Sequence, residues 1–211
     1  PMGWADIFVL LFVTIGPVRA SLVYLGLTKS ADDSLKRAIA FRTVTVSTVI
    51  CLVFALIGAA ILAGLKVTTE ALLIAGGIIL LLFAINLILG EDKDQGADGP
   101  PPTPSLDVAT YPLAVPLMAS PQGLVAIVAI EGTLQGTGDG AIFLVLILAV
   151  MAINLGFLLA ADKIFAKIPP ATLKIVLRIV GLLLCALAVQ LMIFGFDGLG
   201  LIPDPEVELN G

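Results

Sequence analysis

The chain has 211 residues, of which 59% are apolar and only 13% are charged, and its mean hydropathy is +1.14. A soluble domain is about 45–50% apolar and about one quarter charged, so this composition excludes a soluble enzyme. The net charge of −5 excludes a nucleic-acid-binding protein, which needs clustered Lys and Arg to neutralise phosphates. The lipid bilayer is therefore the first expected partner.

Long uncharged runs recur along the chain. A helix that crosses a membrane needs about 20 mostly apolar residues, and the runs predict six such helices, the first of them interrupted by Arg19. The opening run lacks a basic start and a small-residue cleavage site, so we expect it to be a span and not a signal peptide. The expected spans are residues 5–28, 43–65, 71–90, 108–130, 141–161 and 179–196.

The spans form two groups of three, separated by an acidic stretch rich in Pro and Gly. This stretch is typical of a flexible linker, although a docking segment is the alternative interpretation. The tail is also acidic and lacks basic residues. We therefore expect a first three-helix unit at 1–90, a cytoplasmic linker at 91–110, a second unit at 111–196 and a C-terminal tail at 197–211.

The basic residues lie almost entirely on one side of this topology. The first, third and fifth loops carry nine of them, whereas the opposite side carries Lys66 alone. Because cytoplasmic loops are enriched in Lys and Arg, these three loops are predicted to be cytoplasmic and both termini to lie outside. We expect a multi-pass protein of the prokaryotic plasma (inner) membrane.

The two units resemble each other. Pro17 and Pro121 are 104 residues apart, and Ile74-Ala75-Gly76-Gly77 precedes the similar Ile179-Val180-Gly181-Leu182 by 105 residues. Two landmarks with nearly the same offset indicate a duplicated three-helix unit. Because three is odd, the second unit enters the membrane from the other side. The predicted fold class is therefore an all-α membrane protein whose six transmembrane helices form two inverted three-helix repeats.

Each unit carries a proline near the middle of its first span. Proline removes one backbone donor and clashes with the preceding turn, so it frees polar backbone groups that lipid cannot satisfy. Many transporters bind their substrate at the midplane, where such broken helices of two repeats meet; simple packing kinks are the alternative. The predicted substrate-binding residues are Gly16, Pro17, Val18, Arg19, Ser120, Pro121, Gln122 and Gly123, with Asn86 and Gln190 as supporting polar residues.

Arg19 is the one basic residue deep inside a predicted span. Such residues usually face a cavity or a partner, because a central Arg is costly to insert. Two roles remain open: Arg19 binds the carboxylate of an anionic or zwitterionic substrate, or it reaches the interface or pairs with carbonyls freed around Gly16 or Ser120. Asn154 is expected to be a hydrogen-bonding residue between helices.

Several short segments resemble the MarC-related integral membrane proteins, within the broader LysE-like transporter group. They are Gly16-Pro17 with Tyr24-Leu25-Gly26-Leu27-Thr28, Ile74-Ala75-Gly76-Gly77-Ile78-Ile79-Leu80, Pro112-Leu113-Ala114-Val115-Pro116 with Ser120-Pro121, and Arg178-Ile179-Val180-Gly181-Leu182 with Ala188-Val189-Gln190. The resemblance implies a six-span inner-membrane protein, and some family members are assigned to transport of small neutral amino acids. The chain departs from the usual pattern at Gly16, Arg19, Leu22 and Gln122.

These observations predict a secondary transporter of a small polar metabolite, in the class of neutral amino acids or similar small zwitterions or anions. The alternatives are a structural or assembly protein without a substrate and a passive channel. The chain has no His, no acidic pair inside a span and no phosphate-binding loop, so we expect no enzyme, no metal, no cofactor and no ATP-driven step. A small-molecule substrate, a coupling ion and a homo-oligomer are the partners that this interpretation allows.

Overall fold

Every element of the described chain is a helix. The computed structural model describes residues 3–89, 104–134, 136–165 and 169–201. The linker residues 91–103 and the tail residues 202–211 lie outside this range. The all-α prediction is confirmed for the described residues. The elements are α1 (Trp4–Ile15), α2 (Pro17–Leu27), α3 (Asp33–Gly64), α4 (Thr69–Leu89), η3 (Leu106–Ala109), η4 (Thr110–Met118), α5 (Pro121–Glu131), α6 (Thr137–Phe165) and α7 (Pro170–Gly198).

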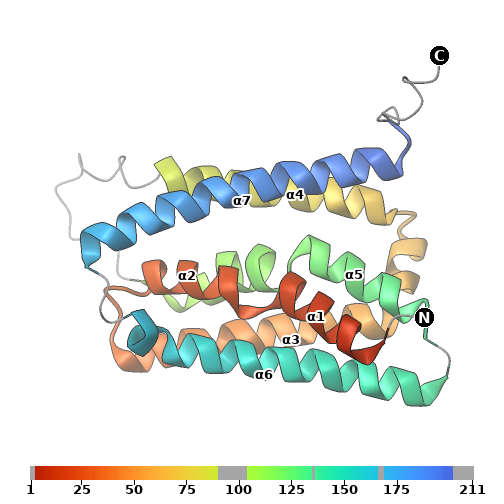
Figure 1. The fold of residues 1–211 in the computed structure, drawn as a ribbon, viewed down its shortest axis with the longest axis horizontal. Helices are drawn as coiled ribbons and strands as arrows, with labels where there is room; N and C mark the ends of the chain where they lie inside the picture. The colour runs from red at the N-terminus through yellow and green to blue at the C-terminus, as the bar shows by residue number, and fades with distance from the viewer. Residues whose placement is uncertain (1–2, 90–103, 135, 166–168, 202–211) are drawn as a thin grey trace.

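The helices lie in three layers (Figure 1). The antiparallel helices α4 and α7 pack side by side in one outer layer, and α3 and α6 form the other. Between them lie α1 with α2, and η4 with α5, which contact helices of both outer layers. Both broken segments are therefore held in the centre of the molecule.

The membrane spans are partly as predicted. Four segments are long and apolar enough to cross a membrane, namely Trp4–Leu27, Asp33–Gly64, Thr137–Ile164 and Arg178–Gly198. The pair Leu106–Met118 and Pro121–Glu131, bent by 56°, gives a fifth if it counts as one span. The apolar stretch of α4, Thr69–Ile85, is shorter than these. Four or five crossings thus follow from helix length and hydropathy in the described chain, and six remains a prediction.

Three of the helices are longer than the uncharged runs that predicted them. Helix α3 begins at Asp33 and not near residue 43, because Asp32 caps it by accepting a hydrogen bond of 3.0 Å from the Leu35 backbone N–H. Helices α6 and α7 likewise extend past the predicted 141–161 and 179–196. An uncharged run indicates only the part of a helix that suits the hydrocarbon core of a bilayer. The helix itself can continue into the aqueous interface, because its backbone hydrogen bonds do not depend on apolar side chains.

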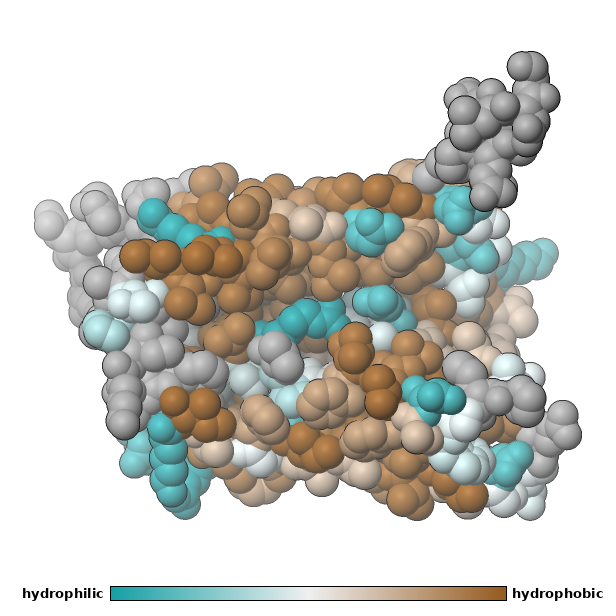
Figure 2. Space-filling model, in the orientation of Figure 1, coloured by the Kyte–Doolittle hydropathy of each residue, from teal (hydrophilic) through white to brown (hydrophobic). Residues whose placement is uncertain are grey.

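The lateral surface is apolar. Large hydrophobic side chains such as Val13, Leu56 and Leu182 are more than half exposed, and Figure 2 shows that apolar side chains cover most of one face, with hydrophilic groups near its middle over α1, α2 and α5. Exposed apolar surface on this scale marks a protein that is surrounded by lipid. The α2–α3 turn and the start of α7 lie at one end of the molecule, and the α3–α4 and α5–α6 connections lie at the other (Figure 1).

Candidate functional site

The first break lies between α1 and α2. Gly16 is extended, with φ −83° and ψ −179°, so it ends α1 and caps α2, while Pro17 is the first residue of α2. A Cβ at Gly16 would overlap the carbonyl oxygen of Phe12. Proline has no N–H to continue the helix. The break is therefore fixed by the Gly-Pro pair itself, and it lies where the sequence predicted it.

The second break lies between η4 and α5. The backbone of η4 is irregular, because Tyr111 and Val115 have non-helical dihedral angles. Ser120 is extended and caps α5 by accepting a hydrogen bond of 3.1 Å from the Gly123 N–H, and Pro121 is the first helical residue. The chain turns by 56° at this point. This break, too, is at the predicted proline.

The two breaks contact each other. The Ser120 hydroxyl donates a hydrogen bond of 2.7 Å to the carbonyl oxygen of Thr14, in the last turn of α1. In the first turn of α5, a Cβ at Gly123 would overlap the Ile15 side chain. Thr14, Ile15, Ser120 and Gly123 are all buried. Residues that are about 105 positions apart in the sequence thus form one close contact between the two halves.

Asn154 of α6 completes this contact. Its side-chain Nδ2 donates a hydrogen bond of 2.7 Å to the carbonyl oxygen of Ile15, and the residue is fully buried. The last carbonyls of a helix have no partner within the helix, so Asn154 satisfies one that the break leaves free. The sequence predicts that Asn154 bonds between helices, and the structure places it at the site itself. A lone polar residue in the middle of the span 141–161 was the available signal.

Arg19 also bonds to the free carbonyls. Its Nη2 donates hydrogen bonds of 2.6 Å to the Thr14 oxygen and 3.4 Å to the Val13 oxygen. The side chain borders a cavity of about 280 Å³, together with Phe12, Val13 and Gly16. Among the described residues, no carboxylate lies within ion-pair distance of Arg19. Arg19 thus pairs with carbonyls freed by the break. Because a guanidinium has five N–H donors, Arg19 retains donors for a further acceptor.

The chain matches the family model described as MarC family integral membrane protein over residues 3–199. This protein belongs to the MarC family of integral membrane proteins. It is similar to the UPF0056 membrane protein MJ1677 of Methanocaldococcus jannaschii, with 31% identity over 190 residues that cover 89% of this chain and 93% of the relative. It is also similar to the UPF0056 membrane protein YvbG of Bacillus subtilis, with 24% identity over 200 residues that cover 92% and 93%. No solved structure matches the chain significantly.

Membership of the MarC family confirms the resemblance stated above and makes this a multi-pass membrane protein. The matched range contains both breaks and every predicted site residue. The names of these relatives describe membrane proteins and give no substrate.

The remaining predicted site residues of this MarC-family protein differ in how close they lie to the breaks. Gln122 lies partly buried on the first turn of α5, beside the break, whereas Gln190 is exposed on α7. The backbone of Val18 and Asn86 is helical, but their side chains lie outside what the structure describes.

Glycines bring α4 close to both α5 and α7. A Cβ at Gly76 would overlap the Pro121 ring, so this turn of α4 lies directly on the second break. A Cβ at Gly77 would come within 2.8 Å of the Ala188 carbonyl oxygen on α7, and one at Gly181 would come within 2.7 Å of Ile88. The Gly-containing segments that indicated a repeat in the sequence therefore lie where helices approach closely.

Proposed function

We propose that this MarC-family protein is a secondary transporter of a small polar metabolite, in the class of neutral amino acids or similar small zwitterions or anions. The observation that carries the proposal is the contact of the two breaks, in which Thr14 of the first half accepts a hydrogen bond from Ser120 of the second. Broken helices that meet at the interface of two repeats are the arrangement in which many secondary transporters bind substrate.

The contacts between helices support an inverted repeat. If α1, α2, α3 and α4 are exchanged with η4, α5, α6 and α7, the contact of α2 with α6 becomes that of α5 with α3, which is also present. In the same way α1–α6 corresponds to α3–η4, α2–α7 to α4–α5, and α1–α5 to α2–η4. Equivalent helices also contact each other, as α3 with α6 and α4 with α7. Such correspondence is expected of two units related by a two-fold axis.

The chemistry of the break supports a substrate with a carboxylate. The guanidinium of Arg19 borders the cavity of about 280 Å³, and its remaining donors suit a planar anionic group. In this proposal Gly16, Pro17, Val18, Arg19, Ser120, Pro121, Gln122 and Gly123 form the binding site. Asn86 and Gln190 would support it from α4 and α7. The driving force would be a coupling ion or the solute gradient itself.

The distribution of charge supports a location in the prokaryotic plasma membrane with both termini outside. The first and fifth loops, which carry most of the described basic residues, lie at the same end of the molecule in Figure 1. The N-terminal end of α1 lies at the opposite end.

Counterflow in proteoliposomes tests the transport proposal. Vesicles loaded with an unlabelled solute are diluted into the same radiolabelled solute, with alanine, glycine, serine, threonine, propionate and lactate as the panel. A carrier accumulates label transiently, and Arg19→Ala proteoliposomes, with protein content matched, should lose that accumulation. Absence of counterflow with every member of the panel would favour a structural or assembly protein, whereas uptake without a counterflow overshoot would indicate a passive channel.

A further inference from the structure

The helix pair α3 and α6 differs between its two ends. At the end that carries the basic loops, Lys36 Nζ lies 3.1 Å and 3.0 Å from the two carboxylate oxygens of Asp162. The Lys36 carbonyl oxygen also accepts a hydrogen bond of 2.9 Å from the Tyr24 hydroxyl. The start of α3, the end of α6 and the end of α2 are thus joined by polar contacts. The Lys36–Asp162 contact links the first unit to the second at this end.

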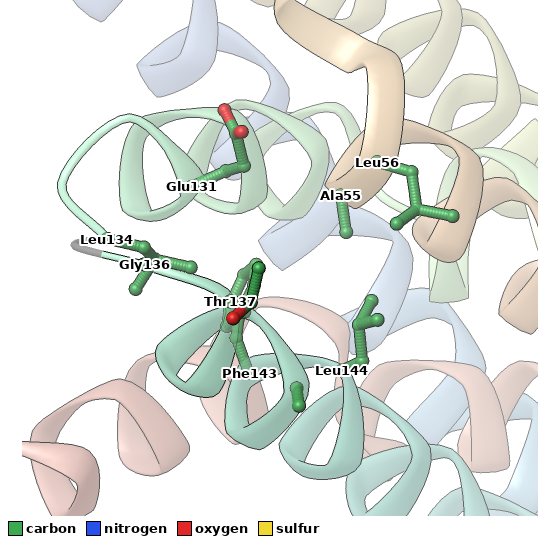
Figure 3. Close-up of a pocket in the computed structure, with 10 residues that line it drawn as sticks. Ala55, Leu56, Glu131, Leu134, Gly136, Thr137, Phe143 and Leu144 are labelled. Carbon is green, nitrogen blue, oxygen red and sulfur yellow. The ribbon is translucent and has the colours of Figure 1, made fainter.

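At the opposite end, the same two helices border a cavity. It has a volume of about 410 Å³ and lies between α3, the end of α5 and the start of α6, with Ala55 and Leu56 from α3, Glu131 from α5, and Thr137, Phe143 and Leu144 from α6 (Figure 3). Gly136 and Gly140 also line it, and a Cβ built at either residue meets no atom within 4 Å. One end of the helix pair is therefore bridged, and the other is open.

Helix α5 connects this cavity to the site. Its last residue, Glu131, lines the cavity, and its capping residue, Ser120, forms the contact with the first break. Eleven helical residues span about 16 Å. Ile127, on the same helix between Glu131 and Gly123, is fully buried. A solute in the cavity would thus lie at the far end of α5 from the break, with the buried Ile127 between the two.

We infer that this cavity is the outer vestibule through which a small, ammonium-bearing solute reaches the site, and that the Lys36–Asp162 bridge holds the cytoplasmic end closed. The inference rests on the proposed transport function and on the predicted orientation. Among the described residues that line the cavity, Glu131 alone is charged. Its carboxylate attracts an ammonium group and repels a simple carboxylate. The structure is then the outward-facing state of the transporter.

Side-specific thiol labelling tests the vestibule. In a full-length C51A/C185A background that retains counterflow, Thr137→Cys places a thiol in the cavity, and Thr133→Cys places one on an exposed residue that does not line it. A membrane-impermeant thiol reagent added outside intact cells should label both. Alanine in excess should slow the labelling of Thr137→Cys only, whereas propionate should slow neither. Labelling of Thr137→Cys only from the cytoplasmic side, or equal rates with and without alanine, would overturn the vestibule.

Occlusion provides a second test of the vestibule. Gly140→Leu adds a large side chain to the lining of the cavity, at a position where an added Cβ meets no atom within 4 Å. Gly64→Leu adds the same side chain at a position that is equally open to a Cβ and lies outside the cavity. Counterflow of alanine should fall in the Gly140 variant and stay near that of the parent protein in the Gly64 variant. Equal counterflow in both variants, at matched melting temperatures, would contradict the vestibule.

The role of the Lys36–Asp162 bridge is tested by the labelling rate of a thiol next to it. Ala161→Cys lies fully buried on α6 beside Asp162, so we expect slow labelling from the cytoplasmic side in inverted vesicles. Adding Lys36→Met should raise its rate about threefold, because a partly exposed ion pair of modest strength is lost. The matched control is Lys163→Met, which removes the exposed lysine that follows Asp162 on α6. This substitution should leave the labelling rate unchanged.

The charge-exchanged pair Lys36→Asp with Asp162→Lys should restore slow labelling. A rate that does not respond to Lys36→Met would overturn the role of the bridge. The labelling rates are measured independently of transport. Absence of counterflow together with the expected labelling pattern would refute the transporter. Counterflow together with a different labelling pattern would refute only the vestibule and the bridge.

Discussion

Pro121 packs its ring directly onto Gly76, so that no atom larger than hydrogen fits at that position of α4. Pro121 begins α5 at the second break, and Gly76 belongs to the first unit. The second break is thus supported on one side by the Thr14 carbonyl and on the other by the bare backbone of α4. Close packing of this kind, and not chain flexibility, holds the break in position.

Gly76→Ala should therefore destabilise the protein. An added methyl group that has no space usually costs about 1–3 kcal/mol, and it should lower the melting temperature measured in detergent. Gly156→Ala is the matched control, because Gly156 lies on α6 with no atom within 4 Å of an added Cβ. Alanine stabilises a helix interior relative to glycine, so this control should melt at the same temperature or higher. Equal melting temperatures for the two variants would show that α5 does not rest on α4.

Ser120→Ala should weaken the contact of the two breaks. The hydroxyl both donates to the Thr14 carbonyl and accepts from the Gly123 N–H, and it is buried. Loss of a helix cap costs about 0.5–2 kcal/mol, and the Thr14 oxygen loses one donor as well. Ser105→Ala removes a comparable cap at the exposed start of η3 and should change the melting temperature much less. If the two substitutions lower the melting temperature equally, the bond from Ser120 to the Thr14 carbonyl adds no stability beyond that of a helix cap.

The location of the breaks could be predicted from the sequence, but the groups that satisfy them could not. Proline marks a break by its own covalent structure, so Pro17 and Pro121 were readable without any tertiary information. Asn154 was not placed at the site, because the choice of carbonyl that it bonds depends on how α6 packs against α1. The first turns of α3 and α7, which begin earlier in the sequence than predicted, were missed for a simpler reason. Charged residues end a hydrophobic run without ending a helix.

The two roles left open for Arg19 show the same limit. Its position in the sequence indicated a costly charge that needed partners, and the structure supplies the Thr14 and Val13 carbonyls. The pairing uses local backbone that the Gly16 break exposes, a detail set by the dihedral angles of a single residue. Substrate binding by the remaining donors stays a prediction.

Asn154→Leu should destabilise the protein, although it makes α6 more apolar. The Ile15 carbonyl oxygen would lose its 2.7 Å hydrogen bond inside the membrane. Measured side-chain bonds between membrane helices average about 0.6 kcal/mol, with a maximum of about 1.7, so the expected fall in melting temperature is modest. Thr45→Leu is the control, since Thr45 is exposed on α3 and should tolerate the change. A control as destabilised as Asn154→Leu would mean that the amide of Asn154 has no special role.

Arg19→Lys and Arg19→Ala should separate the two roles of Arg19. Lysine retains a donor that can reach the Thr14 carbonyl, so its melting temperature without solute should stay near that of the parent protein. It lacks the planar fork that binds a carboxylate with two bonds, so the solute concentration for half-maximal thermal stabilisation should rise about tenfold. Alanine should lower the basal melting temperature and also abolish stabilisation by the solute that gives counterflow. If Arg19→Ala melts earlier yet still responds fully to that solute, Arg19 serves only the carbonyls of α1, and the carboxylate must bind elsewhere.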